Sequence, residues 1–211
     1  MTELVVGKAG RPKSVQKRKQ ILVAAGELFL EQGFSGCSMD MVAKHSAVSK
    51  QTVYSHFSNK EALFTAVINA KCKDYQLDSQ QLEHESGRFE DILQQIGLQI
   101  IRLLHDSQVI ALYRIVIGEV SSNPRAAELF YQAGPQHNMT MLAQCFLRFH
   151  QGALTESQAM QSALVFFNAL KGEFHTKSVL GLDFALNQEQ QQQHVEEAIA
   201  ALQDFIKRLM Q

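Results

Sequence analysis

Apolar residues recur at helical spacing through most of the chain, in separate segments whose opposite faces are polar. In the first segment Ile21, Ala25, Leu28 and Phe29 share one side, and lysine, arginine and glutamate residues occupy the other. The same reasoning predicts helices over about 14–33, 38–46, 49–57, 59–75, 89–105, 109–120, 124–134, 137–150, 155–180 and 194–210. The sequence has no alternating β-branched segment bounded by turn residues, the pattern typical of a strand. We therefore expect an all-α protein.

Two of the expected helices are very short and follow each other closely within residues 38–57. Ser38 begins the first and Ser49 the second, because a serine hydroxyl can accept hydrogen bonds from the first backbone N–H groups of a helix. Gly33 ends the helix before them. Two short helices joined by a tight turn are typical of a helix-turn-helix, which places the first turn of its second helix against base edges of DNA.

The second short helix carries polar side chains that suit DNA. Lys50, Gln51 and Thr52 form its first turn, and these residue types suit guanine, adenine, and a thymine methyl group or phosphate, respectively. Tyr54 and His56 follow and suit phosphate oxygens. Helix starts also favour phosphates through their backbone N–H groups, and the expected contacts there are Ser38, Ser49 and Lys60.

Charge is distributed unevenly along the chain, although the formal net charge is only −1. Residues 1–60 carry nine Lys and Arg against four Asp and Glu, whereas residues 61–211 carry eleven against seventeen. A basic N-terminal part on an acidic remainder favours nucleic acid as a partner. The alternative is that these charges are scattered over solvated faces without a common partner.

Residues 49–63, SKQTVYSHFSNKEAL, resemble the signature of the TetR/AcrR family of transcriptional regulators. Further matches to the first two helices of that family are Ala24, Leu28, Phe29, Gly33, Phe34, Val42 and Ala43. The resemblance implies that Thr52, Tyr54, His56 and Lys60 contact the DNA backbone. It also implies that Lys50 and Gln51 lie where operator reading varies between members.

Two features near this motif need separate interpretation. The family usually has glycine in the turn where this chain has Ala47; if the position needs a positive φ, alanine costs roughly 1 kcal/mol relative to glycine. The segment 10–13, GRPK, resembles the core of an AT-hook, which would place Arg11 in a minor groove. A solvated tail is the alternative for that segment.

We divide the chain into a flexible basic arm over 1–13, a helix-turn-helix domain over 14–58 and a helical regulatory and dimerisation domain over 59–211. A polar stretch over 76–88 marks a boundary or a frayed helix end, and 181–193 is expected to be a loop.

A single helix-turn-helix buries too little surface for tight operator binding, so the C-terminal domain is expected to form a homodimer that reads two half-sites of a pseudo-palindromic operator. The expected helices over 137–150 and 155–180 are the best candidates, and in TetR-like proteins the corresponding pair forms a four-helix bundle across the two-fold axis. The candidate interface residues are Cys145, Phe149, Met160, Leu164, Phe167 and Lys171. The alternative is that this apolar stripe belongs to the core of one chain.

Residues 123–135 and the Leu170-Lys171-Gly172 segment resemble the C-terminal domain of AefR-like members of the family. The family resemblance alone implies a cavity for a small-molecule effector of unknown identity. Its candidate lining residues are Phe64, Ile68, His105, Tyr113, Phe130, Met141, Phe167 and His175. Each of them could instead be an ordinary core residue.

Other classes of function find little support. Cys37, Cys72 and Cys145 form no CxxC pair and no metal spacing. No two histidines are spaced i, i+4 with a carboxylate partner, so we expect neither metal nor cofactor. We find no membrane span or signal peptide and expect a cytoplasmic protein. No nucleophile–base pair or phosphate loop indicates an enzyme. The leading hypothesis is a homodimeric repressor released by a small molecule; the alternative is a ligand-independent activator or architectural DNA-binding protein.

Overall fold

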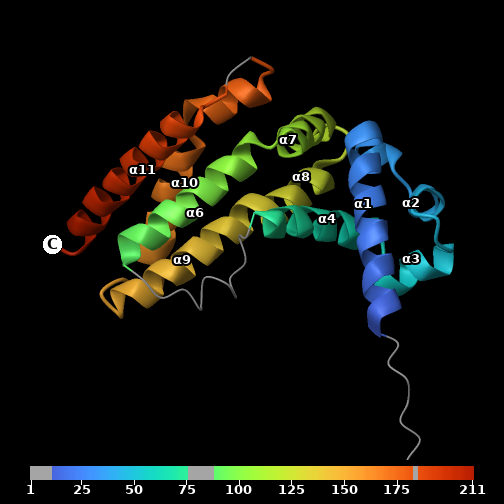
Figure 1. Cartoon of the computed structure of the whole chain (residues 1–211), viewed down its shortest axis with the longest axis horizontal. Helices are drawn as coiled ribbons and strands as arrows, with labels where there is room; N and C mark the ends of the chain where they lie inside the picture. Colours follow the sequence, from blue (N-terminus) through green and yellow to red (C-terminus); the bar gives the residue numbers. More distant parts are fainter. Residues whose placement is uncertain (1–10, 76–87, 183–184) are drawn as a thin grey trace, which may run out of the picture. The chain divides into compact units, whose positions relative to one another are not determined.

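The computed structural model describes residues 11–75, 88–182 and 185–211, with side chains from residue 14 onward. Every regular element in the described residues is a helix (Figure 1). The chain forms two compact units that divide between Val67 and Ile68, inside the helix α4, Lys60–Asp74. The all-α prediction is confirmed.

The N-terminal unit contains α1 (Arg11–Gly36), α2 (Met39–His45), α3 (Lys50–His56) and the first half of α4. Three phenylalanines meet in its core. The ring of Phe64 lies edge-on to those of Phe29 and Phe34, with centroid distances of 4.9 and 5.0 Å. Large buried aromatic side chains of this kind contribute most of the apolar area in a small core. The unit therefore folds around side chains from α1 and α4, with α2 and α3 packed on α1.

Two bounds of α1 differ from the sequence prediction. The helix begins at Arg11 instead of near Ser14, so the expected arm over 1–13 is helical in its last three residues, and residues 1–10 lie outside the described residues. At its other end Gly33 has non-helical angles, φ 73° and ψ 176°, and a last helical turn follows it to Gly36. A left-handed φ is open to glycine because it lacks a Cβ atom. Gly33 thus interrupts α1 at the position where the sequence predicted that the helix ends.

The turn between α2 and α3 has Ala47 at φ 53°, in the left-handed region. The backbone N–H of Val48 then bonds to the carbonyl oxygen of Ala43 at 3.1 Å, which closes the turn. The sequence prediction that alanine stands where glycine would be favoured is confirmed. The strained angle costs of the order of 1 kcal/mol, which the rest of the unit must offset.

Within the residues that the structure describes, the C-terminal unit contains the second half of α4 and seven further elements. They are α6 (Phe89–His105), α7 (Ser107–Glu119), α8 (Pro124–Tyr131), the π-helical turn η1 (Gln132–Gln136), α9 (His137–His150), α10 (Glu156–Val179) and α11 (Gln188–Leu209). Helix α10 packs against α9 and α11, and α6 packs against α10 and α11. Val195 of α11 fills the space beside Gly97 of α6, where a Cβ atom would lie 2.6 Å from the Val195 Cγ1.

Three predicted bounds in this unit were wrong. Residues 188–193, expected as loop, are the start of α11, because Asn187 and Gln190 form a reciprocal capping box and glutamine is a good helix former. The helix expected over 124–134 ends at Tyr131, and the turn η1, which contains Pro135, joins it to α9. Helix α7 begins at Ser107, because the Asp106 carboxylate accepts from the N–H groups of Gln108 and Val109 at 2.8 and 3.0 Å.

The expected polar boundary over 76–88 lies outside the described residues apart from Arg88. None of the described helices combines the length and the apolar character that crossing a bilayer requires.

Candidate functional site

Both helices of the helix-turn-helix begin at serine residues. The Ser38 hydroxyl accepts a hydrogen bond from the N–H of Met41 at 3.2 Å, and the Ser49 hydroxyl accepts one from the N–H of Thr52 at 3.1 Å. The Ser49 and Thr52 hydroxyls also lie 2.8 Å apart. Caps of this kind typically stabilise a helix by about 1 kcal/mol. The capping roles predicted for Ser38 and Ser49 are confirmed.

Helix α3 buries one side and exposes the other. Val53 is fully buried and Phe57, which ends the helix, is 4% exposed, so both anchor the helix in the N-terminal unit. The residues expected to contact DNA are exposed or half-buried: Lys50, Gln51, Thr52, Tyr54 and His56. The first turn of α3 therefore offers polar groups to a partner while its opposite face holds it in place.

Asp40 lies beside the candidate base-reading residue Lys50. The Lys50 ammonium is 2.8 Å from one carboxylate oxygen of Asp40 and 3.0 Å from the other, and both side chains are exposed. The hydrogen bond to Asp40 and its charge raise the pKa of Lys50. Sequence analysis assigned Asp40 no role at DNA. It had no signal for this contact, because the tight turn between α2 and α3 brings together residues ten positions apart.

Lys60 holds the end of α1. Its ammonium donates to the carbonyl oxygens of Phe34 at 2.8 Å, Cys37 at 2.9 Å and Ser35 at 3.4 Å, and it lies 4.6 Å from the centre of the Phe34 ring. An ammonium has three donors, and carbonyls at the C-terminal end of a helix lack intrahelical partners. The sequence prediction assigned Lys60 to a DNA phosphate. In this structure a phosphate would compete with those three carbonyls.

Arg11, the remaining residue expected at DNA, is the first residue of α1, and its side chain lies outside the described part of the structure.

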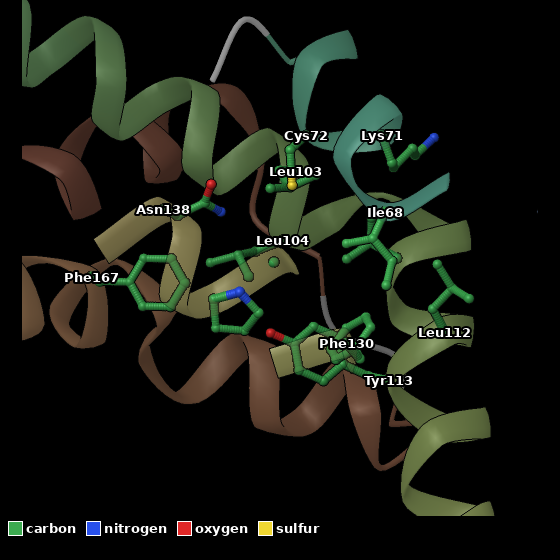
Figure 2. A pocket seen from close by; sticks show the side chains of 13 residues that line it. Ile68, Lys71, Cys72, Leu103, Leu104, Leu112, Tyr113, Phe130, Asn138 and Phe167 are labelled. Atoms are coloured by element: carbon green, nitrogen blue, oxygen red, sulfur yellow. The ribbon is translucent and has the colours of Figure 1, made fainter. Parts of the chain in front are cut away.

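A small cavity lies within the C-terminal unit (Figure 2). Its wall comes from α4, α6, α7, α8 with η1, α9 and α10. Four of the residues that the sequence predicted for an effector cavity line it: Ile68, Tyr113, Phe130 and Phe167. The cavity has a volume of about 30 Å³, roughly enough for one or two water molecules. The cavity in this structure is therefore too small for an organic ligand.

The other four predicted cavity residues lie elsewhere. Phe64 belongs to the core of the N-terminal unit, and Met141 is buried in α9 away from the lining. His105 stacks on Phe174 at a centroid distance of 4.3 Å, and its ring nitrogens contact the Ile101 carbonyl and the N–H of Leu186. These contacts give His105 a structural role.

His175 lies behind the cavity wall. Its ring is edge-on to that of Tyr113 at 4.7 Å, and the side chain is only 2% exposed. Burial, the Lys171 charge and His105 lower its pKa to about 4, although the Leu104 carbonyl acts in the opposite direction. Neither ring nitrogen has a hydrogen-bond partner of good geometry. His175 is therefore neutral at pH 7.

Sequence reasoning missed the polar residues of the cavity, Lys71, Cys72 and Asn138. Asn138 is 2% exposed, and its amide contacts the Cys72 sulfur. Burial raises the pKa of the Cys72 thiol to about 11 and that of Tyr113 to about 12, so both stay neutral at pH 7. The signal for Asn138 was a single amide in the stripe that it shares with Met141, Leu142 and Cys145, which is otherwise apolar.

A salt bridge neutralises Lys71, which belongs to the described lining of the cavity. The Lys71 ammonium is 2.8 Å from the Asp106 carboxylate and donates to Gln108 at 3.0 Å, while the Tyr75 hydroxyl donates to Asp106 at 2.6 Å. Burial alone would raise the pKa of Asp106, but the hydrogen bonds from Lys71 and Tyr75 outweigh burial and lower it. The Lys71 ammonium points away from the cavity (Figure 2). Its charge is therefore paired outside the apolar space.

The candidate dimer residues differ in exposure. Met160 and Leu164 lie one turn apart on α10 and are 40% and 46% exposed. Phe149 and Lys171 are half-buried, whereas Cys145 and Phe167 are covered within the chain. Of the residues predicted at the interface, Met160 and Leu164 are the ones that leave apolar surface open.

Comparisons with known proteins agree with this architecture. Residues 21–67 match the bacterial regulatory proteins of the tetR family, and residues 91–204 match the C-terminal domain of AefR-like transcriptional repressors. The chain belongs to the TetR family of transcriptional regulators, which bind DNA through a helix-turn-helix and are not enzymes.

Individual relatives resemble the chain over different lengths. The solved structure of the flavonoid-responsive regulator FrrA is 33% identical, with a TM-score of 0.67, and the match covers 92% of this chain and 97% of FrrA. The transcriptional regulator UidR of Escherichia coli K12 is 49% identical over 51 residues, 24% of this chain and 26% of UidR. The transcriptional activator FasR of Mycolicibacterium smegmatis is 42% identical over 53 residues, 25% and 24% of the two chains. The matches to these two curated relatives thus span about a quarter of their length.

Proposed function

We propose that this regulator is a homodimeric repressor that binds a pseudo-palindromic operator in the cytoplasm and is released from it by a small-molecule effector. The observation that carries the DNA-binding part is the first turn of α3, which is capped by Ser49, anchored by Val53 and exposed at Lys50 and Gln51.

The DNA contacts follow from the chemistry of that surface. Gln51 has the donor–acceptor pair that matches adenine, and Lys50 suits the two acceptors of guanine. Thr52, Tyr54 and His56 would contact phosphates and set the position of α3 in the major groove. Asp40 keeps Lys50 beside α2 in the free protein, so the lysine must exchange a carboxylate for a base when the operator binds.

The dimer is supported by exposed apolar side chains on α10. Met160 and Leu164 form a stripe that remains open within one chain, and burial of such side chains stabilises association. Two copies would place two recognition helices about one DNA turn apart, roughly 34 Å, as pseudo-palindromic operators require.

Release by an effector is supported by the path of α4. This helix contributes Ile68, Lys71 and Cys72 to the cavity wall and continues back to Lys60, which holds the end of α1. A ligand that opens the cavity would act on a helix shared by both units. It shifts the operator equilibrium only if it binds one arrangement more tightly than the other. FrrA is named as a flavonoid-responsive regulator, which supports a C-terminal unit that responds to an effector.

The alternative, a ligand-independent activator or architectural protein, also has an observation in its favour. The cavity volume of about 30 Å³ is far below the roughly 300 Å³ of the smallest ordinary ligand pockets. In addition, FasR, which matches the DNA-binding segment, is named as an activator.

Fluorescence anisotropy with DNA fragments from the region upstream of the gene tests the proposal. We expect saturable binding of one dimer to a pseudo-palindromic fragment, in preference to a scrambled duplex of the same length. We also expect release of the DNA by a compound that binds in the cavity and widens it. Absence of sequence preference, with a dimer shown by sedimentation, would refute the operator-binding part. Specific binding that no cavity ligand changes would favour the alternative.

A further inference from the structure

Three polar side chains are fully buried in the described part of the chain, and they differ in how they are satisfied. The Ser162 hydroxyl donates to the carbonyl oxygen of Gln158 at 2.8 Å. Asn138 and His175 each retain atoms without a hydrogen-bond partner: Oδ1 of Asn138 and both ring nitrogens of His175. Of these two residues only Asn138 lines the cavity. An unpaired buried polar atom is unfavourable and calls for an explanation.

The amide of Asn138 has one end engaged and one end available. Its N–H side contacts the Cys72 sulfur on α4, which leaves the carbonyl oxygen Oδ1 without a donor. An amide carbonyl accepts up to two hydrogen bonds. A ligand in this cavity can therefore satisfy Asn138 by supplying an O–H or N–H group.

The remaining wall selects against charge and favours aromatic rings. The rings of Tyr113 and Phe130 meet edge to face with centroids 4.7 Å apart, and Phe167 also lines the space (Figure 2). Lys71 is paired with Asp106 and directed outward, so no cation faces inward from the described lining to balance a carboxylate or phosphate. Lys171 lies outside this lining, with its ammonium 5.5 Å from the centre of the Tyr113 ring. A charged ligand would therefore leave water without a counter-charge in contact with it, which is strongly unfavourable.

We propose that the effector is an uncharged aromatic compound with a phenolic hydroxyl, which donates its O–H to Asn138 Oδ1 while its ring packs against Tyr113, Phe130 and Phe167. This inference rests on the proposed function, because it treats the cavity as the effector site. A ring does not fit within about 30 Å³. The compound therefore binds and stabilises a conformation in which the cavity is wider.

A matched pair of probes isolates the hydroxyl. Isothermal titration of the full chain with 2-naphthol and with 2-methoxynaphthalene compares the same ring system with and without a donor. We expect 2-naphthol to bind about tenfold more tightly or better, because without a donor Oδ1 stays unpaired. Decanoate, a charged aliphatic compound with the same number of carbon atoms, is expected to bind at least about tenfold more weakly than 2-naphthol. Equal affinities for the two naphthalenes, or a preference for decanoate, would overturn the proposal.

Two variants assign the discrimination to Asn138. Asn138→Leu keeps the volume and removes the acceptor, so the affinity ratio of the two naphthalenes is expected to fall to about one. Ser162→Ala, the matched control, removes a buried hydroxyl that is satisfied within its own helix and is expected to leave the ratio unchanged. A ratio that persists in Asn138→Leu contradicts the assignment. Should that variant not fold, the side-chain amide signal of Asn138 in wild-type protein gives the same information, since it should shift with 2-naphthol and not with the methyl ether.

Operator binding separates this inference from the proposed function. If the operator is bound specifically and decanoate, not 2-naphthol, releases it, the phenol assignment fails and the ligand-released regulator stands. If 2-naphthol is discriminated as expected but the protein shows no sequence preference for DNA, the ligand site stands and the proposed function fails.

Discussion

The two units of this protein place their candidate functional side chains in opposite environments. In the N-terminal unit Lys50, Gln51 and Tyr54 lie on the surface of one short helix, whose start and anchors are local. In the C-terminal unit the candidate site is buried and draws its wall from α4, α6, α7, α8 with η1, α9 and α10. A surface motif requires only that its own short helices fold correctly, whereas a buried site requires many segments distant in sequence to pack correctly. Perturbations should therefore act differently on the two.

The largest effect is expected from Phe64→Ala, in the core of the N-terminal unit. Removing a buried phenylalanine costs about 3–5 kcal/mol, and Phe64 joins Phe29 and Phe34. Hydrogen exchange should show lost protection in α1, α2 and α3, and operator binding should be lost. Met141→Ala, a buried change in α9, is the control and should lower protection in the C-terminal unit instead. Equal loss in both units for both variants would mean that they unfold as one.

The second-largest effect is expected in the pH dependence of stability, through the buried His175 of the C-terminal unit. His175 has a folded pKa of about 4 against an ordinary value of 6.5, so between these pH values the unfolded chain binds a proton that the folded chain does not. Stability is therefore unaffected above about pH 6.5, falls as the pH drops towards 4, and is lower by about 3 kcal/mol below that.

Urea unfolding of wild type and His175→Leu at several pH values measures this contribution. The variant should lose most of the slope between pH 6.5 and 4, whereas His137→Gln, a change at an exposed histidine of α9, should retain it. Parallel slopes for wild type and His175→Leu would contradict the prediction.

The third prediction tests base reading by α3. Gln51→Ala should lower affinity for the preferred operator by about 1–3 kcal/mol and relax the base preference at one position of each half-site. Its stability should be unchanged, because the side chain is exposed. Anisotropy against single-base operator variants gives the profile. A uniform loss over all sequences would instead indicate a phosphate contact.

Lys60→Met separates two roles of the same side chain. If its ammonium contacts a phosphate in the complex, the slope of log affinity against log salt should be shallower than that of wild type by about one per half-site. If it serves only the carbonyls of Phe34, Ser35 and Cys37, the slope should not change and the loss, about 1–2 kcal/mol, should appear in stability. The competition with three carbonyls leads us to expect the stability effect. A change of slope at unaltered stability would restore the phosphate role.

The smallest effect is expected in the turn between α2 and α3. Ala47→Gly should stabilise the N-terminal unit by roughly 1 kcal/mol, because φ is 53° and glycine adopts it without strain. Ala66→Gly, in the helical part of α4 within the same unit, should destabilise by a similar amount. Thermal unfolding monitored by circular dichroism compares the two. A loss of stability in Ala47→Gly would show that flexibility of the unfolded chain outweighs the strain.

The sequence alone predicted the helices, the two serine caps and the irregular turn at Ala47, since each depends on spacing or hydrogen bonding within a few residues. It also identified the family from residues 49–63. It missed the start of α11, because a run of glutamines has no apolar pattern, and the turn η1, because proline and glycine usually end a helix. The sequence did not predict that Asp40 pairs with Lys50 or that Lys60 lies at the end of α1. The reason is different, because these contacts depend on how the helices pack against one another.

What the sequence determined by itself is the class of protein and which face of α3 stays polar and exposed, because periodicity and caps are local properties of the chain. Only the tertiary structure decided which candidate residues share a cavity, that Phe64 and His105 lie outside it, and that Asn138 carries an unpaired oxygen there. The physical reason is that hydrogen-bond satisfaction and burial are set by neighbours from other helices. A polar residue in an apolar stripe shows that something must pair with it, but not what.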